Sequence, residues 1–207
     1  MKLATGLAQG LVALGLTIPP AAQEQLIGYL SLLDKWNAAY NLTAVRGRER
    51  MLTHHLLDCL AVVPHLPGGN WVDVGSGAGL PGIPVALASP DASITLVDSS
   101  HKKTAFLEQV VIELGLRNVT VARSRIEEWQ PERRFDVVIS RALSDLPEFL
   151  ALAGRLCAPD GVIAAMKGVY PHAELSQVPP SYRLRSVVAL EVPGLTAHRH
   201  LVLIGPA

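Results

Sequence analysis

A glycine-rich segment, Val72-Asp-Val-Gly-Ser-Gly-Ala-Gly79, has the residue types of a cofactor-binding turn. Its valines favour a strand, and its three glycines carry no Cβ, so the chain can turn sharply and lie close to a ligand. Pro81 and Pro84 then suit the first turn of a helix, where a missing N–H does no harm. A strand, a glycine loop and a helix in this order are typical of the turn that holds a nucleotide cofactor in an α/β sheet.

The spacing of the glycines separates two kinds of cofactor. A dinucleotide loop has the pattern G-x-G-x-x-G, but after Gly75 and Gly77 its third glycine would fall on Leu80. The actual pattern is G-x-G-x-G, which ends at Gly79 and is preceded by Asp73. This pattern resembles the S-adenosylmethionine (SAM) loop of class I methyltransferases, and it predicts SAM as the cofactor.

A carboxylate at the end of the next β-rich run supports a nucleoside-containing cofactor. The run Ile94-Thr-Leu-Val-Asp98 follows the glycine loop at the spacing of a second strand. In such folds an acidic residue at the end of the second strand accepts hydrogen bonds from the ribose hydroxyls. We therefore predict that Asp98 belongs to the cofactor site.

Basic side chains follow successive predicted strands. Arg125 comes after the third strand, Arg141 after the fourth, Lys167 ends the fifth, and Arg199 lies in the final hairpin. Ligands of an open α/β sheet bind outside the carboxyl ends of its strands, so these cations are expected near the cofactor edge. A site for an anion or a polyanion such as RNA is the favoured interpretation. The alternative is a set of solvated surface side chains.

Two other acceptor chemistries lack the residues they need. Methylation of an exocyclic base amine commonly uses an Asn/Asp/Ser-Pro-Pro-aromatic segment after the fourth strand, and residues 139–145 do not have it. Methylation at pyrimidine C5 needs a cysteine nucleophile, but Cys157 precedes the fifth strand, at the wrong edge of the sheet. An acceptor that is already nucleophilic, such as a ring nitrogen with a lone pair, fits these absences better.

A metal site is not expected. His54, His55 and Asp58 lie within one helical turn, but no second cluster of ligands follows, which favours packing or capping roles. The two cysteines, Cys59 and Cys157, cannot build a disulfide framework and favour a cytosolic protein.

The elements that must position these residues form an α/β pattern. Residues 1–66 are expected to be helical, with helices to about Leu16 and over 23–39 and 48–63, and the Pro- and Gly-rich stretch 64–69 divides this N-terminal helical extension from a methyltransferase domain over 67–207. Helices are expected between the first five strands, and a final hairpin is antiparallel. The expected fold is that of class I SAM-dependent methyltransferases: Rossmann-like, with a mostly parallel seven-stranded sheet. The expected strands are 71–74, 94–98, 119–122, 136–140, 162–166, 184–192 and 200–204.

The composition indicates in which cellular compartment the protein acts, but it does not indicate what the protein binds. The 207 residues include 18 basic and 18 acidic side chains, so bulk charge does not indicate nucleic acid. Lys2 and the apolar run to Ile18 resemble a signal peptide, but leucines recur on one face of a helix, which favours an amphipathic helix. No stretch reaches the roughly 18 apolar residues of a membrane span. We expect a cytoplasmic protein without membrane contact.

Seven segments form a more specific pattern: Trp36-Asn37-x-x-Tyr40-Asn41-Leu42-Thr43-x-Val45, His55-x-x-Asp58, Val72-Asp-Val-Gly-Ser-Gly-Ala-Gly-Leu-Pro-Gly-Ile-Pro84, Ser124-Arg125-Ile126-Glu127, Ile139-Ser-Arg-Ala142, Lys167-Gly168 and Arg199-His200-Leu-Val. In these segments the chain resembles the small-subunit ribosomal RNA guanine-N7 methyltransferases, also called the glucose-inhibited division protein B family. The resemblance runs from the N-terminal helix to the last strand. Ala78 and Cys59 depart from the family's usual proline and serine.

The resemblance implies methyl transfer from SAM to N7 of one guanine of 16S rRNA, in a loop beside the decoding centre. We also expect a monomer that acts on 16S rRNA within the small ribosomal subunit or its precursor, with no metal. Because N7 of guanine carries a lone pair and no proton, no side chain is expected to act as a nucleophile or in proton transfer. The expected cofactor-binding residues are Gly75, Gly77, Gly79, Leu80, Asp98, Ile126, Glu127 and Arg141, and the expected RNA-binding residues are Arg125, Arg141, Lys167 and Arg199.

Three alternatives remain open. One is a small-molecule methyltransferase whose pocket is closed by an apolar cap. The second is a SAM-binding regulatory protein without turnover. The third concerns Trp36 and Tyr40, which could form a stacking platform for RNA but which, at this helical spacing, are more often part of a core.

Overall fold

A seven-stranded sheet with the order β3-β2-β1-β4-β5-β7-β6 runs through the computed structural model, which describes residues 2–141 and 144–207. The first five strands pair in parallel, and β7 pairs antiparallel with β5 and β6. The predicted fold class and the terminal hairpin are therefore confirmed. The strands are β1 (Asn70–Val74), β2 (Ser93–Asp98), β3 (Val119–Arg123), β4 (Phe135–Arg141), β5 (Cys157–Lys167), β6 (Tyr182–Ala189) and β7 (His200–Pro206).

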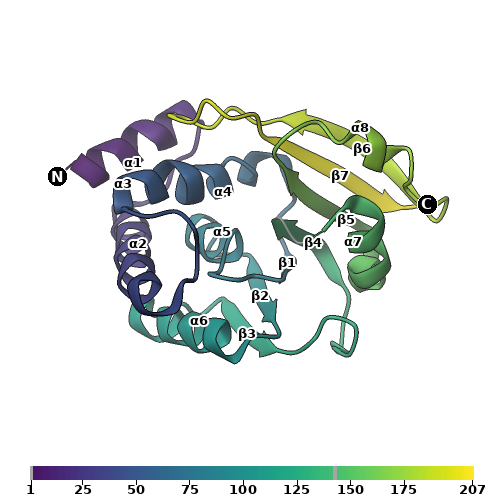
Figure 1. Cartoon of the computed structure of the whole chain (residues 1–207), viewed down its shortest axis with the longest axis horizontal. Coiled ribbons are helices and arrows are strands. Elements are labelled where there is room, and N and C mark those ends of the chain that lie inside the picture. The colour runs from purple at the N-terminus through teal and green to yellow at the C-terminus, as the bar shows by residue number, and fades with distance from the viewer. Residues whose placement is uncertain (1, 142–143) are drawn as a thin grey trace.

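Helices cover both faces of this sheet, as Figure 1 shows. On one face lie α1 (Lys2–Ala13), α2 (Pro20–Tyr40), α5 (Gly82–Ala88), α6 (His101–Leu114) and a continuous helical stretch made of α3 (Arg48–Met51), a π-helical part (Leu52–Leu57) and α4 (Asp58–Leu60). On the other face lie α7 (Leu146–Ala153) and α8 (His172–Leu175). Short 3₁₀ turns cover Val63–His65 and Gly154–Leu156.

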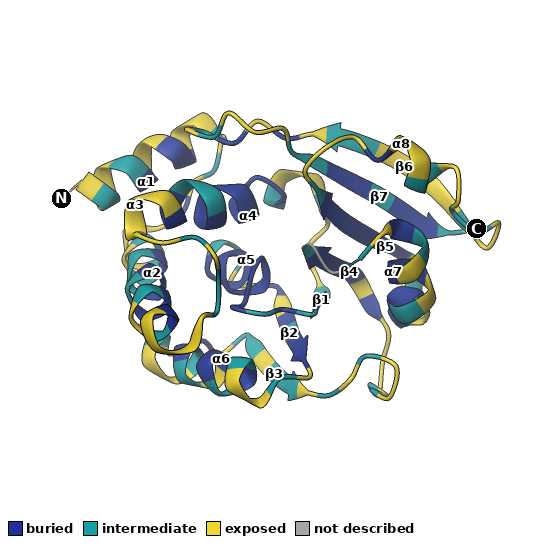
Figure 2. Ribbon diagram, viewed as in Figure 1, coloured by how far each residue is buried: buried dark blue, intermediate teal, exposed yellow. Residues whose placement is uncertain are grey.

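Alternation along the strands divides the core into two layers. Trp71, Ile94 and Leu96 pack under the N-terminal helices, α5 and α6, whereas Val72 and Val97 pack under α7. Figure 2 shows long buried stretches in the central strands. Because strand side chains alternate between faces, strands buried on both sides need apolar residues at every position. This explains why their sequences are nearly continuous apolar runs.

The N-terminal helices share one apolar cluster with the helices that flank the sheet. Leu7 and Leu11 of α1 are buried in the same cluster as Ile83 of α5 and Phe106 of α6, which confirms an amphipathic helix at the start of the chain. Tyr29 of α2 is fully buried, and its hydroxyl donates a 2.7 Å hydrogen bond to the carbonyl oxygen of Ala78 in the glycine loop. The helices before β1 thus support the loop directly. The division of the chain at residues 66 and 67 remains a prediction.

The crossover from β3 to β4 differs from expectation, because the predicted helix is absent from residues 124–134. A single turn forms instead, in which the Trp129 amide donates to the Arg125 carbonyl. The Arg155 guanidinium donates hydrogen bonds to the carbonyl oxygens of Ile126 and Trp129 at 2.6 and 2.7 Å. In addition, Pro131 has no N–H with which to extend a helix. Trp129 stacks on Phe135 and packs against the apolar cluster under α7.

Two smaller features of the helices also bear on the predictions. The helix predicted over 48–63 is continuous over 48–60 but contains the π-helical part, which periodicity alone does not reveal. Within the described ranges, no helix has both the length and the apolar content that crossing a bilayer requires.

Candidate cofactor and substrate site

The glycine loop is tied to the ends of two strands. Gly75 and Ser76 donate from their amides to the carbonyl oxygen of Val97 at 2.9 and 3.0 Å, and Gly77 donates to the Asp98 carboxylate at 2.9 Å. Gly79 has a φ of +85°, and a Cβ there would lie 2.6 Å from Ile83 Cγ1. Only glycine satisfies both the backbone conformation and the contact with α5.

Asp73, the acidic residue before the loop, is a buried anchor for the start of α5. Its Oδ2 accepts the Gly82 amide at 2.9 Å, while its Oδ1 has no hydrogen-bond partner among the described residues. Burial raises the pKa of this carboxyl to about 7, and the Gly82 amide opposes that rise. The Asp73 side chain therefore supports the loop from behind.

A cavity of about 340 Å³ opens beside the loop, where β1, β2, β3 and β4 end. This is the place where the strand order reverses, between β1 and β4, and where ligands bind in sheets of this kind. Among the predicted site residues, Gly75, Asp98, Arg125, Ile126, Glu127 and Arg141 line this cavity. We call it the cofactor cavity.

The other loop residues lie around this cavity without lining it. Gly77 holds Asp98 through its amide, as described above. Gly79 and Leu80 are buried behind the loop, and Leu80 packs in the core cluster. Whether these residues contact the cofactor remains a prediction. In the structure they help to set the shape of the loop.

The cavity's lining suits a nucleoside. The Asp98 carboxylate is 6% exposed, and its oxygens accept the amides of Ser100 and Gly77, each at 2.9 Å. Oδ2 also pairs with Lys103 Nζ at 3.4 Å, so the acceptor capacity that remains for a ribose hydroxyl lies mainly on Oδ1, which has a second lone pair. Ile126 and Leu152 provide apolar surface for a flat ring. These residues fit SAM.

We expect Asp98→Ala to weaken SAM binding by roughly 1.5–3 kcal/mol, the scale of hydrogen bonds to a charged group. The variant also frees Gly77, so the effect should fall at the upper end of that range. Calorimetric titration with SAM measures it. Asp91→Ala removes an exposed carboxylate from the preceding turn and serves as the control. Equal SAM affinity in the two variants would remove Asp98 from the site.

A second cavity, of about 360 Å³, adjoins the first. It is lined by Val45, His54, His55, Asp58, Arg141, Met166, Lys167, Gly168 and Arg199. Arg141 lines both cavities and therefore stands at their boundary. The structure brings three of the four predicted RNA-binding cations to this second cavity. The fourth, Arg125, lines the cofactor cavity instead.

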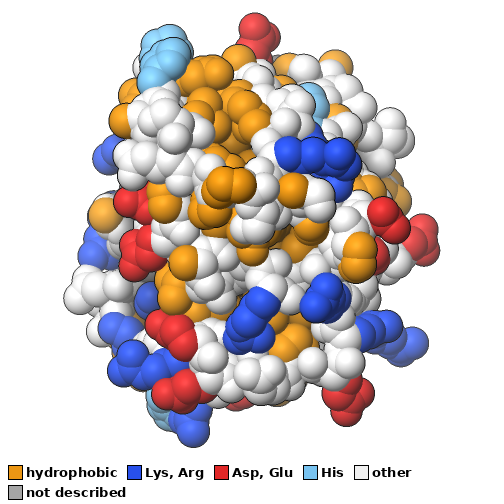
Figure 3. Space-filling model, turned by 90° about the vertical axis from the view of Figure 1, so that its right-hand side faces the viewer, with side chains coloured by type: hydrophobic (Ala, Val, Ile, Leu, Met, Phe, Trp, Pro, Cys, Tyr) orange, Lys and Arg blue, Asp and Glu red, His pale blue; other side chains and the backbone are white. Residues whose placement is uncertain are grey.

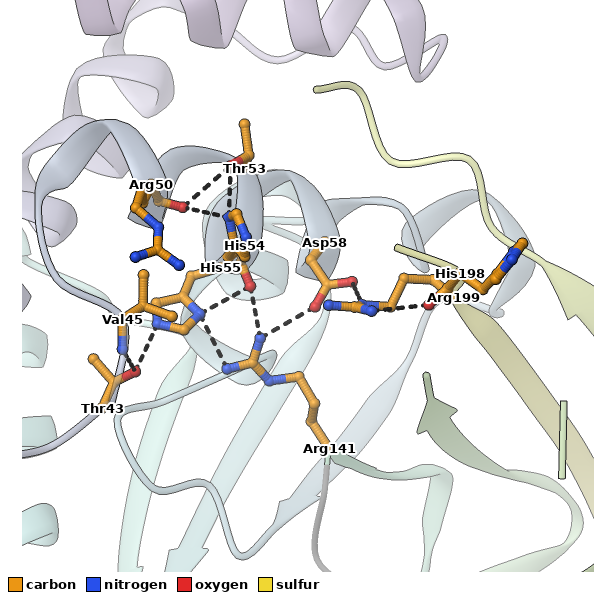
Figure 4. Close-up of polar contacts among 10 residues, drawn as sticks. All are labelled: Thr43, Val45, Arg50, Thr53, His54, His55, Asp58, Arg141, His198 and Arg199. Atoms are coloured by element: carbon orange, nitrogen blue, oxygen red, sulfur yellow. Dashed lines mark hydrogen bonds and ion pairs between the residues drawn. The ribbon is translucent and has the colours of Figure 1, made fainter. Parts of the chain in front are cut away.

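One buried carboxylate holds two of these cations, as Figure 4 shows. Asp58 of α4 is 2% exposed. Its Oδ2 lies 3.2 Å from Arg141 Nη1, and its Oδ1 lies 2.9 Å from Arg199 Nε. Arg141 also donates to the His54 carbonyl oxygen at 3.2 Å. The two guanidinium groups are thereby fixed in place before any ligand binds.

The neighbouring histidines are engaged in the same region. His55 Nε2 lies 2.9 Å from Thr43 Oγ1. Burial and the positive charge of Arg141 lower the pKa of His55 to about 4, so its ring is neutral at physiological pH. Among the described residues there is no group of three or more His, Cys, Asp or Glu side chains placed to bind a metal.

Lys167 is also paired. Its Nζ lies 2.7 Å from Glu174 Oε2 and donates to the Ser144 carbonyl oxygen at 2.8 Å. The same Glu174 oxygen accepts the Leu146 amide at the start of α7. Sequence reasoning missed both Asp58 and Glu174 as partners of the cations. The resemblance segment His55-x-x-Asp58 was a signal for the first, and the sequence carried none for the second.

The aromatic pair in α2 divides between the core and the surface. Trp36 packs 5.5 Å from the Phe106 ring and joins the core cluster. The ring centroids of Tyr40 and Trp36 are 5.2 Å apart, but the Tyr40 side chain is exposed at the end of α2. The core interpretation therefore holds for Trp36, and Tyr40 is a surface residue.

The sheet order, the glycine loop and the cavity at the reversal of strand order define a class I SAM-dependent methyltransferase, whose cofactor is SAM. The fold resembles that of a SAM-dependent methyltransferase from Aquifex aeolicus, with a TM-score of 0.58 and 18% identity, covering 86% of this chain and 97% of that one. A complex of DhpI with SAH matches similarly, with a TM-score of 0.58, 17% identity and coverage of 90% and 97%.

The sequence comparisons identify the family. The family model described as rRNA small subunit methyltransferase G matches residues 22–202. The ribosomal RNA small subunit methyltransferase G of Laribacter hongkongensis is 53% identical over 99% of both chains. The chain belongs to the rRNA small subunit methyltransferase G family.

Proposed function

We propose that this protein transfers the methyl group of SAM to N7 of a single guanine in 16S rRNA, beside the decoding centre, and that it acts in the cytoplasm on the small ribosomal subunit or its precursor. The names of its relatives support ribosomal RNA as the substrate. The observation that carries the proposal is the adjacency of the two cavities. They share Arg141, and the second holds three ordered cations.

An N7 acceptor asks little of the protein. SAM supplies an electrophilic methyl group, and N7 of guanine carries an in-plane lone pair and no proton. No general base is needed, so catalysis consists mainly of orienting the two groups and excluding water. A cation beside the developing purinium charge would oppose the reaction. Arg141 and Lys167 are therefore assigned to phosphate or O6 rather than to proton transfer.

The titratable side chains of the second cavity agree with such an acceptor. Asp58 is held by two guanidinium groups, and the pKa of His55 is about 4. His54 Nδ1 lies 2.8 Å from Thr53 Oγ1 and 3.1 Å from the Arg50 carbonyl oxygen. Asp58 and both ring nitrogens of His55 are thereby engaged within the protein, whereas among the described residues the hydrogen-bond contacts of the His54 ring involve Nδ1 alone.

The thiols do not support pyrimidine C5 methylation. Cys157 lies at the start of β5, at the edge of the sheet opposite the cavities, and burial raises the pKa of its thiol to about 11. Cys59 is completely buried, and burial raises the pKa of its thiol as well. Neither side chain offers a thiolate to a base in the site.

The direct experiment uses small ribosomal subunits from cells that lack this protein. Incubated with the enzyme and SAM carrying a labelled methyl group, their 16S rRNA should gain label at one guanine, and chemical strand scission at N7-methylguanine should map it. Subunits from unmodified cells should gain none. Label in another atom of the base, or no label in rRNA, would contradict the proposal. A small-molecule acceptor or a non-catalytic protein predicts the second result.

The salt dependence of binding tests the RNA contacts. We expect Arg125→Ala, Lys167→Ala and Arg199→Ala each to lower the slope of log affinity against log salt by about 1, because each removes one phosphate contact. SAM affinity should change little for Lys167 and Arg199, which line only the second cavity. Arg117→Ala, an exposed cation before β3, is the control. Unchanged slopes and unchanged methylation rates at low and high salt would exclude this set of cations from the RNA site.

A further inference from the structure

Three aromatic rings meet on the surface beside the second cavity. The ring of Tyr170 lies 4.3 Å from that of His172 and 5.6 Å from that of His200, which approaches it edge-on at 84°. Tyr170 is 41% exposed, and the neighbouring Val169 is 74% exposed. None of these three side chains lines the cofactor cavity. They form an apolar and aromatic surface that the core does not explain.

The chain path fixes this surface at the edge of the second cavity. Gly168 lines that cavity, and its carbonyl oxygen lies 3.0 Å from His200 Nδ1, within hydrogen-bond distance. Lys167 and His200 are paired in the register of β5 and β7. Tyr170 therefore follows Lys167 by three positions and contacts the residue after Arg199.

The wider surface near this loop has mixed character. The loop leads from β5 to α8, on the right in Figure 1. Viewed from that side, Figure 3 shows hydrophobic side chains gathered in the upper half of the molecule, with Lys and Arg side chains beside and below them. An aromatic ring next to cations is the combination by which proteins hold single-stranded RNA, since bases stack on the ring while cations neutralise phosphates.

We propose that Tyr170, supported by His172 and His200, is a stacking platform for an rRNA base adjacent to the methylated guanine. This inference rests on the proposed function. N7 lies in the deep and narrow major groove of A-form RNA, so the target guanine must be unpaired or turned out to react. A neighbouring base that leaves the stack with it needs a new partner. Tyr170, three residues after Lys167, offers one.

The test compares Tyr170→Ala with Tyr170→Phe, which keeps the ring, and with Ile112→Ala, which removes an exposed apolar side chain of α6. Methylation-deficient small subunits are the probe. Tyr170→Ala should bind them about tenfold more weakly, whereas Tyr170→Phe and Ile112→Ala should bind like the wild type. The SAM dissociation constant should not change. The salt slope should also stay unchanged, because a stacked ring neutralises no phosphate.

Binding is measured separately from methyl transfer, which keeps the two proposals apart. Failure of the wild type to methylate the subunits would overturn the proposed function. Equal subunit binding by the wild type and Tyr170→Ala would overturn the platform, whatever the outcome of transfer. A tenfold loss that Tyr170→Phe shares would overturn it too, since it would assign the effect to the hydroxyl. Thermal unfolding of each variant checks that its fold is intact.

Discussion

Arg141→Ala should lower methyl transfer on the order of 100-fold, because a reacting pair that is misplaced by about 1 Å loses this much. It should also weaken SAM binding, since Arg141 is the residue that lines both cavities. The fold should lose stability as well. Asp58 is buried, and removing one of its two partners leaves its charge half compensated, at a cost of about 3 kcal/mol.

Arg199→Ala is the matched control, because Arg199 is the other partner of the same carboxylate and lines only the second cavity. Denaturant unfolding should show similar losses of stability for the two variants. Calorimetry should show weakened SAM binding only for Arg141→Ala. Equal effects of the two variants on SAM affinity would contradict the boundary position of Arg141.

Gly79→Ala should destabilise the protein by roughly 2–5 kcal/mol and weaken SAM binding with it. Holding alanine in the left-handed region costs about 1–2 kcal/mol, and forcing a methyl group into a packed core adds about 1–3 kcal/mol. The Cβ would lie 2.6 Å from Ile83 Cγ1 and 2.8 Å from Leu107 Cδ2, both in fully buried side chains. Relief of these contacts would move the loop that includes Gly75.

Gly115→Ala separates the two terms. Gly115 ends α6 with a φ of +63°, and a Cβ there would meet no atom within 4 Å. Its loss of stability should be limited to the cost of holding alanine in the left-handed region, and its SAM affinity should equal that of the wild type. Denaturant unfolding of both variants gives the comparison. If Gly115→Ala proved as destabilising as Gly79→Ala, packing of α5 and α6 against the loop would not be the cause.

Much of the architecture could be predicted because it is encoded locally. Strands buried on both faces require continuous apolar runs, and glycine and proline mark their ends, so every predicted strand exists. The position of Asp98 at the end of β2 followed from the same regularity. Basic residues at strand ends had to converge on one edge, and Arg141, Lys167 and Arg199 do line one cavity.

The missing parts depend on contacts between distant residues. Asp58 meets Arg199 across 141 positions of sequence, and its carboxylate could have been a metal ligand, a cap or an ion-pair partner until the fold was known. The turn after β3 depends on Arg155, which comes 26 positions after Trp129. Residue type and spacing do not reveal which charged residue, distant in the sequence, lies beside a given side chain in the folded protein. Only the fold places Arg125 at the cofactor cavity rather than the second one, and its role in RNA binding remains a prediction.

The packing of α2 against α5 and α6 has a consequence for biosynthesis. Leu26 and Leu33 of α2 are fully buried in the cluster that contains Phe106 of α6. The ribosome completes α2 well before it reaches α6, which ends at Leu114. At about 5–20 residues per second, the nascent chain carries this leucine-rich face uncovered for several seconds. A newly made copy of this protein is therefore expected to need chaperone cover at its first helices until α6 emerges.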